Sequence, residues 1–200
     1  HVPSVRAHRG DGRLHPADDA RAQPLQAVGP GDRNRTHPPL AEADPGDLAV
    51  RGSHGELYIV ERRKHVIVLP NGKKVFPAQD LHEELASCPA IEEFAVLPLQ
   101  EKGKGERIGM VVKPDVSACR KEGAETLGDA CRVVRSQILR ALEDRPTYMK
   151  DLDFCLTEVR DGEFAELQKN AAGEPTPAGN EFRPRRRFRH LKNDDTPLPA

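Results

Sequence analysis

Tryptophan is absent from this chain of 200 residues, and aromatic residues make up only 4% of it. Hydrophobic residues reach 36%, while 18 prolines and 16 glycines interrupt regular elements. So few large apolar side chains cannot fill a core that spans the whole chain. We therefore expect a folded middle flanked by poorly ordered ends.

Long apolar runs are also lacking, and no stretch approaches the roughly 20 residues that a transmembrane helix needs. No signal peptide is visible, and the chain opens on His1 rather than Met, which we interpret as the mark of a fragment, a processed product or an incomplete gene model. The net charge is only -1, which argues against a protein that binds polyanions over its whole surface.

The four cysteines form no Cys-x-x-Cys pair and have no metal-ligand spacing with histidine. No metal site is predicted. Each cysteine is expected to behave as a small apolar residue in a reducing compartment, which predicts a cytoplasmic protein. They are Cys88, Cys119, Cys131 and Cys155.

Residues 1–45 have no Lys, Ile, Phe, Tyr or Trp, and they show no apolar period of 2 or 3.6. Arginine, proline, glycine and alanine dominate this segment. Two interpretations stay open: a disordered extension, or a non-homologous stretch translated from GC-rich DNA in a wrong frame. Neither supports a function.

Residues 46 to 160 carry alternating β-rich and helical patterns. The clearest is an apolar residue at every third or fourth position from Leu127 to Leu142, which is typical of an amphipathic helix. Pro70-Asn71-Gly72 is a turn signal, because glycine tolerates positive φ. The expected elements are, in chain order, a hairpin of strands 56–60 and 66–69, a helix from Pro77 to Cys88, strands 92–97 and 107–113, a helix over 127–142 and a strand over 151–157.

This order predicts an α+β domain of about 110 residues, with a mixed sheet of about three strands packed with two helices. We divide the chain into the extension 1–45, a junction hairpin 46–69, a domain 70–160 and a tail 161–200. The tail is rich in proline and contains the basic run 183–190. Such a composition is typical of a solvated, disordered segment.

Residues 55–78 read Gly-Glu-Leu-Tyr-Ile-Val-Glu-Arg-Arg-Lys-His-Val-Ile-Val-Leu-Pro-Asn-Gly-Lys-Lys-Val-Phe-Pro-Ala. This stretch resembles the signature that joins the two domains of adenylate-forming acyl-CoA synthetases, Gly-Tyr-Leu-Tyr-Ile-x-Gly-Arg-x-Lys-Asn/Asp-x-Ile followed by Asn/Gly-Gly-Lys/Glu-Asn-Val-Tyr/Phe-Pro. Residues 88–96, 105–114 and 146–150 are similar to three further motifs of that family, in the same order. The resemblance covers residues 46–174, is closest to the long-chain fatty acyl-CoA synthetases, and implies their small C-terminal lid domain.

That family joins a carboxylate to AMP, using ATP and Mg²⁺, and then passes the acyl group to the thiol of CoA. The resemblance therefore implies ATP or AMP, Mg²⁺ and CoA as cofactors of the intact enzyme, with a fatty acid as substrate. Nothing in residues 1–45 resembles the phosphate loop, adenine pocket or acyl tunnel of the large domain. We expect this fragment to bind none of these ligands tightly and to be inactive by itself.

The resemblance also implies roles for single residues. Asp47 matches the carboxylate that takes both ribose hydroxyls, although Pro45 replaces the preceding threonine. Arg62 matches the arginine that contacts the nucleotide, and Lys64 matches the hinge about which the lid swings between the two half-reactions. Asn71-Gly72-Lys73 would line the CoA tunnel. Without the resemblance, we would interpret Arg62-Arg63-Lys64 as an exposed charged turn between two strands, Asn71-Gly72-Lys73 as a plain β-turn and Asp47 as an ordinary loop aspartate.

One position departs from the family. Residues 167–174 match its terminal Leu-Pro-Lys-Asn/Thr-x-x-Gly-Lys, and Glu174 stands where the last Lys stabilises the adenylation transition state. Reversing a charge about 4 Å from a phosphate changes the energy by on the order of 4 kcal/mol each way at an effective dielectric of about 20. Even with a large domain, the chain is therefore not expected to adenylate efficiently.

Three functions follow from these observations. The first is a fragment of an ATP-dependent long-chain fatty acid-CoA ligase. The second is a non-catalytic interaction module derived from such a lid, which the loss of the catalytic Lys favours. The third is nucleic-acid binding through residues 183–190, which no aromatic-faced sheet or recognition helix supports. Peripheral contact with a membrane also stays open.

Overall fold

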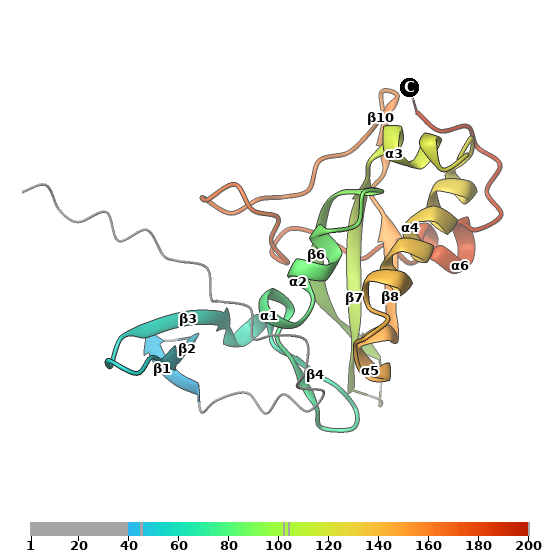
Figure 1. Ribbon diagram of the computed structural model, residues 1–200. Helices are drawn as coiled ribbons and strands as arrows, with labels where there is room; N and C mark the ends of the chain where they lie inside the picture. Colours follow the sequence, from blue (N-terminus) through green and yellow to red (C-terminus); the bar gives the residue numbers. More distant parts are fainter. Residues whose placement is uncertain (1–39, 45, 102, 104, 200) are drawn as a thin grey trace, which may run out of the picture. The chain divides into compact units, whose positions relative to one another are not determined.

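The computed structural model (Figure 1) describes residues 40–44, 46–101, 103 and 105–199, all of them in one compact unit of the chain. The expectations for residues 1–39 lie outside the described residues. The strands are β1 (Leu40–Asp44), β2 (Asp47–Arg51), β3 (Leu57–Arg62), β4 (Ile67–Val68), β5 (Lys74–Val75), β6 (Ile91–Glu101), β7 (Gly105–Pro114), β8 (Leu152–Leu156), β9 (Val159–Arg160) and β10 (Glu163–Phe164). The helices are α1 (Pro77–Asp80), α2 (His82–Ala86), α3 (Val116–Lys121), α4 (Leu127–Ala141), α5 (Thr147–Lys150) and α6 (Phe188–Leu191), with 3-10 helices η1 (Arg63–His65) and η2 (Pro184–Arg186).

Strands β1, β2 and β3 form an antiparallel sheet in that order. Gly46, with a φ of 99°, supplies the left-handed backbone between β1 and β2 that glycine adopts without strain. Strand β1 corrects the expectation that no element occurs before residue 46. Its five residues show no clear alternation of apolar and polar side chains, so the sequence pattern did not predict a strand. Its backbone pairing with β2 is what defines β1 as a strand.

The predicted hairpin of strands 56–60 and 66–69 does not form. Strand β3 pairs with β2, whereas β4 pairs with β5, and η1 separates β3 from β4. The hairpin closes instead at the turn signal, where the Gly72 amide donates to the Leu69 carbonyl at 2.8 Å and Gly72 has a φ of 77°. The hairpin therefore formed where the chain has a turn signal, and the β propensity of the two predicted strands was not enough to pair them with each other.

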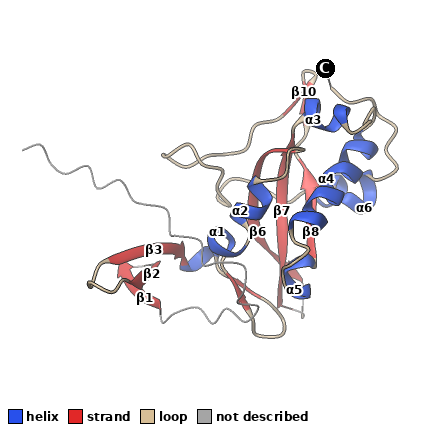
Figure 2. Ribbon diagram, viewed as in Figure 1, coloured by secondary structure: helices blue, strands red, loops and turns tan. Residues whose placement is uncertain are grey.

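The central sheet has the order β6-β7-β8 (Figure 2), with β6 antiparallel and β8 parallel to β7. Helices α3, α4 and α5 lie in the connection from β7 to β8, as a parallel pair requires a crossover. These elements confirm the predicted α+β class with a mixed sheet of three strands. Helix α3 was not expected, because its six residues are too few to show a helical period.

Helix α4 covers one face of this sheet. A capping box starts it, in which Thr126 and Asp129 bond each other's backbone N–H. Its apolar stripe packs with inward residues of β7 and β8 such as Met110 and Phe154, both fully buried. The sequence predicted this stripe, and all of its members are buried: Leu127, Cys131, Val134, Ile138 and Leu142.

The opposite face of the sheet has a smaller apolar cluster. Because side chains alternate along a strand, Val111 and Cys155 point away from α4, and Leu167 packs against them. The segment that follows β10 therefore covers this second face with a side chain from outside the predicted 70–160 domain.

The tail 161–200 was expected to be disordered, and the structure corrects this. Leu191 of α6 and Leu198 are buried in the main core. The carbonyls of Asp194 and Thr196 accept from the Gly128 and Leu127 amides, two first-turn donors of α4 that have no partner within the helix. Backbone bonds and two leucines thus order a segment whose composition is polar. We call residues 188–199 the C-terminal strap.

In the part of the chain that the structure describes, no helix combines the length and the apolar character needed to cross a membrane.

Candidate functional site

Asp47 and Arg62, fifteen residues apart in sequence, face each other across strands β2 and β3. They are directly paired in the sheet register, and Arg62 Nε lies 3.3 Å from Asp47 Oδ1. The Arg62 side chain is 60% exposed and that of Asp47 is 20% exposed. An ion pair this open to water holds its partners weakly, so both groups can exchange each other for a ligand. A carboxylate beside a guanidinium fits hydroxyl donors and an anionic group on one molecule.

Lys64 lies in η1, directly after this pair. It is exposed, as are Arg62 and Arg63. The Arg63 amide donates to the Gly46 carbonyl at 2.7 Å, which fixes the start of the turn to the strand that carries Asp47. Lys64 is therefore the second residue after the sheet ends. We call residues 62–77, from the end of β3 to the start of α1, the joint.

Glu61 directly precedes the joint and His65 lies within it; neither was predicted as a functional residue. Glu61 is 8% exposed, although it belongs to the charged run 61–64. Its carboxylate accepts from the Arg62 and Ala78 amides and lies 3.5 Å from His65 Nδ1. Burial lowers the pKa of His65, against the opposing effect of the Glu61 charge. The signal in the sequence was a Glu where the family signature has Gly.

The Asn71-Gly72-Lys73 turn is exposed and defined by short-range bonds. Asn71 Oδ1 accepts from the Lys73 amide at 3.0 Å. Lys73 Nζ lies 4.3 Å from the centroid of the Tyr148 ring, a cation–π contact with the element that follows α4. Gly72 lines an open surface depression together with Pro70 and Arg107. The turn is thus accessible, and its single cation is held against the domain.

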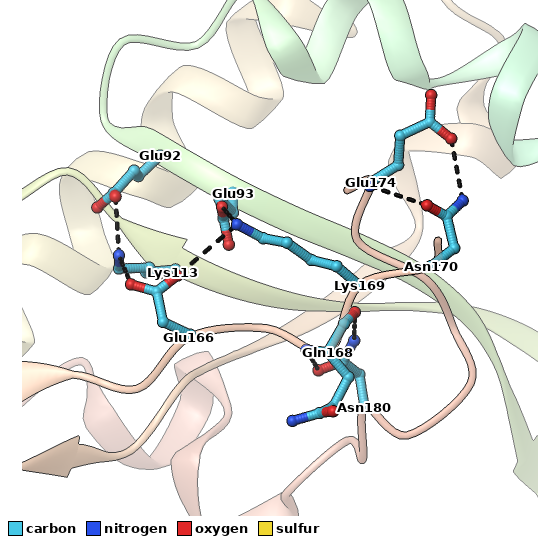
Figure 3. Close-up of polar contacts among 9 residues, drawn as sticks. All are labelled: Glu92, Glu93, Lys113, Glu166, Gln168, Lys169, Asn170, Glu174 and Asn180. Carbon is cyan, nitrogen blue, oxygen red and sulfur yellow. Dashed lines mark hydrogen bonds and ion pairs between the residues drawn. The ribbon is translucent and has the colours of Figure 1, made fainter. Parts of the chain in front are cut away.

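Glu174 lies at the end of a tight loop that begins at Asn170 (Figure 3). The Asn170 side chain closes the loop through two bonds to Glu174, accepting from the Glu174 amide at 3.0 Å and donating to Glu174 Oε2 at 3.1 Å. Within the described residues, no hydrogen bond or ion pair joins Glu174 to Asp47 or Arg62. The loop therefore ends in a carboxylate that Asn170 holds.

Lys169 does not replace the missing cation of that loop. Its ammonium pairs with Glu93 of β6 and lies 3.9 Å from Glu166 (Figure 3). The Glu93 hydrogen bond is the main cause that raises the pKa of Lys169. Lys169 is thus bonded to the sheet, where it neutralises carboxylates.

Lys113 forms the second part of this network (Figure 3). Its ammonium bonds Glu92 at 2.7 Å and Glu166 at 2.5 Å. Burial lowers the pKa of Lys113, but the two carboxylates outweigh burial and raise it above its ordinary value. The hydrogen bond from Lys113 in turn lowers the pKa of Glu166. The network attaches the segment after β10 to β6 and β7.

Several guanidinium groups of the basic run 183–190 have partners within the domain. Arg183 pairs with Glu158, and Arg187 pairs with Asp153 at 2.6 Å. Arg186 donates to the Leu156 carbonyl at 3.3 Å. These bonds give the run a structural role and correct the expectation that it is solvated throughout.

A metal ion has no ligand cluster among residues 40–44, 46–101, 103 and 105–199, where no group of three His, Cys, Asp or Glu side chains converges.

No protein-family model and no curated protein matches the chain. Among solved structures, an o-succinylbenzoate CoA synthetase from Bacillus subtilis is 21% identical, with a TM-score of 0.42, over 78% of this chain and 25% of that one. A fatty acyl CoA synthetase from Mycobacterium tuberculosis is 23% identical, with a TM-score of 0.42, over 65% and 22%.

The A domain of a carboxylic acid reductase from Segniliparus rugosus, in complex with AMP and a co-purified carboxylic acid, is 21% identical, with a TM-score of 0.43, over 56% of this chain and 17% of that one. The chain thus spans a quarter or less of the length of these three proteins. With TM-scores below 0.5, these likenesses establish neither a family nor an activity for this chain.

Proposed function

We propose that the chain carries the joint and lid of an adenylate-forming ligase, which acts together with a large domain that binds ATP, CoA and a fatty acid. The observation that carries this proposal is the contact of Asp47 with Arg62. The family motifs assigned both residues to the nucleotide from sequence alone, and the strand register brings them together. The form of residues 66–73 favours a long-chain fatty acid.

Each group has a distinct role in this proposal. The Asp47 carboxylate accepts hydrogen bonds from the ribose hydroxyls, and the Arg62 guanidinium offers donors to the anionic part of the nucleotide. Lys64 is the hinge, since it is exposed and is the second residue after the end of β3. The Asn71-Gly72-Lys73 turn faces CoA when the lid is in its thioester-forming position. ATP supplies the phosphoanhydride energy that activates the acid.

The two half-reactions are not expected to be served equally. Adenylation needs a cation at the α-phosphate, and the loop from Asn170 to Glu174 contains none. Lys169, which directly precedes the loop, is paired with Glu93. Thioester formation needs the joint and the CoA-facing turn, and both are present. We therefore propose a lid that supports thioester formation and not adenylation.

The test joins residues 40–200 to the large domain of a fatty acyl-CoA synthetase whose own lid has been removed. This protein is given a preformed fatty acyl-adenylate and CoA, and the thioester is measured by mass spectrometry. We expect product well above that of the large domain alone. A rate equal to that of the large domain alone would reject the proposal. The isolated chain is expected to show no ATP–pyrophosphate exchange.

A non-catalytic module is the second candidate, and the bonding of Lys169 to Glu93 favours it. In that case the lid domain would dock on a synthetase or acyl carrier without taking part in either half-reaction. The joined protein distinguishes the two candidates, because a pure docking module gives no thioester. We propose a cytoplasmic location for either function, since all four cysteines are free and buried.

A further inference from the structure

Glu61 connects the two sides of the joint. It precedes Lys64 by three residues, and its Oε2 accepts from the amide of Ala78, seventeen residues further on, at 3.1 Å. Its other oxygen accepts from the Arg62 amide at 3.0 Å. The carboxylate is thus anchored on the β3 side and bonded to the first turn of α1 on the other side.

Helix α1 needs this acceptor. Pro77 has no N–H, and Phe76 at the cap position provides no capping side chain. Asp80 Oδ2 accepts from the Phe76 amide at 2.8 Å. The Ala78 amide is a further donor in the first turn, and its position gives it no partner within the helix. Glu61 satisfies it, and a negative charge at this end also suits the helix dipole.

A swing about Lys64 cannot preserve this bond, because Glu61 and Ala78 lie on opposite sides of the pivot. Opening returns the Ala78 N–H to water and separates it from a charged, buried acceptor, the kind of hydrogen bond that contributes most. His65 lies beside the same carboxylate, with Nδ1 3.5 Å from Glu61 Oε1, so it loses this neighbour in the same motion. The observed arrangement of the joint is therefore more stable than the swung one through the contacts of one side chain, Glu61.

We propose that Glu61 is a latch that holds the joint in its observed arrangement and sets how readily the lid swings. The inference rests on the proposed function only for the identity of Lys64 as the hinge. The family signature has Gly at this position, so a chain that follows the signature lacks the latch. The latch makes this lid slower to leave one arrangement than a lid with Gly there.

Amide hydrogen exchange, resolved by NMR on the full chain, tests the latch without any ligase activity. In Glu61→Ala, the Ala78 amide is expected to exchange roughly ten- to a hundredfold faster than in the wild type. Glu61→Gln retains an acceptor but no charge and should give a smaller increase. The Phe76 amide, held by Asp80, serves as the internal control and should keep its wild-type rate.

Glu56→Gln is the matched control variant. Glu56 lies just before β3, where it accepts from the His54 amide and the Tyr58 hydroxyl, away from the joint. Its substitution should leave Ala78 unchanged. Equal exchange of Ala78 in Glu61→Ala and the wild type would overturn the proposal. If amide exchange became faster at both Phe76 and Ala78, the proposal would also be overturned, because a general loosening of α1 would then explain the result.

Limited trypsin digestion provides a second readout. The exposed bonds after Arg62, Arg63 and Lys64 need local opening to enter a protease site. Cleavage there should be faster in Glu61→Ala than in Glu56→Gln, and equal rates would contradict the latch. If the thioester test fails while these results hold, the ligase proposal and the hinge role of Lys64 fall, and what remains is that Glu61 holds the joint in its observed arrangement. The opposite pattern removes the latch alone.

Discussion

The charged side chains at the start of the joint and those around the loop from Asn170 to Glu174 differ in how open their contacts are to a ligand. Arg62, the first residue of the joint, and Asp47 of β2 form an ion pair at the surface, where a ligand can replace either partner. In the loop segment, Lys169 is paired with Glu93, and Glu174 is bonded to Asn170. One region therefore has an ion pair that is open to a ligand, while the charged groups of the other are bonded within the fold.

Under the proposed function, this difference would separate the two half-reactions in physical terms. A nucleotide can be recognised by groups that are exposed before binding and desolvated afterwards. Transition-state stabilisation needs a preorganised cation at one atom, where the proposal places the Glu174 carboxylate. The proposal therefore predicts a domain that retains binding and lacks one chemical step.

The largest expected effect is a gain of adenylation in the joined protein on Glu174→Lys. The substitution replaces repulsion of the α-phosphate by attraction, which should raise ATP–pyrophosphate exchange by roughly three powers of ten or more. Glu174→Gln removes the repulsion alone and should give a smaller gain. Equal rates for all three proteins would show that residue 174 does not approach the phosphate.

The C-terminal strap provides the next test, through Gly128→Ala. A Cβ at Gly128 would lie 2.9 Å from the Asp194 carbonyl oxygen and 3.0 Å from that of Leu191. We expect a loss of about 1–3 kcal/mol in the free energy of unfolding from this overpacking. In a helix with no strap over it, the same change would instead stabilise by up to about 1 kcal/mol.

Urea unfolding measures the sign of this effect, with Ser136→Ala on the exposed side of α4 as the control. The control should change stability by about 0.5 kcal/mol or less. Stabilisation by Gly128→Ala would mean that residues 188–199 do not pack on α4 and that the tail is solvated after all.

Arg62→Ala sharpens the other side of the comparison. Because its ion pair with Asp47 is largely exposed, the free energy of unfolding should fall by no more than about 1 kcal/mol. Thioester formation by the joined protein should fall far more, through weaker binding of the acyl-adenylate. Parallel losses of stability and turnover would indicate a structural role. Arg51→Ala, another exposed arginine in the same sheet, is the control.

The smallest effect concerns acid and the start of α4. Hydrogen bonds from Thr126 and from the Glu125 and Thr126 amides lower the pKa of Asp129 to about 2. Its stabilisation is therefore present above the unfolded pKa of about 3.9 and is lost as the pH falls through the folded value. The stability difference between wild type and Asp129→Asn, followed by circular dichroism, should shrink from pH 4 to pH 2.

A difference between wild type and Asp129→Asn that stays constant down to pH 2 would contradict the role of the capping box.

Periodicity and turn chemistry predicted the parts of the fold that depend on near neighbours. The stripe of α4 and the turn at Gly72 are both present, because each is determined within a few residues. The pairing of β3 with β2 rather than β4 was missed, since partner choice depends on segments far apart in sequence. The strap was missed because backbone carbonyls, which every residue has, cap α4.

The candidate site divides in the same way. Asp47 and Arg62 came from motif positions, and their contact needed the strand register. Glu61 was missed because a glutamate in the run 61–64 looks exposed, and only the fold buries it beneath α1. The structure tests none of the predicted roles, which stay predictions for all of these residues: Asp47, Arg62, Lys64, the Asn71-Gly72-Lys73 turn and Glu174.

The ratio of the two half-reactions in one preparation of the joined protein tests the central claim most directly. With Glu174 in place, thioester formation from preformed acyl-adenylate should exceed that of the large domain alone. ATP–pyrophosphate exchange by the same preparation should not. Exchange and thioester formation that both exceed the large domain alone by similar factors would contradict the claim that the lid has kept one step and lost the other.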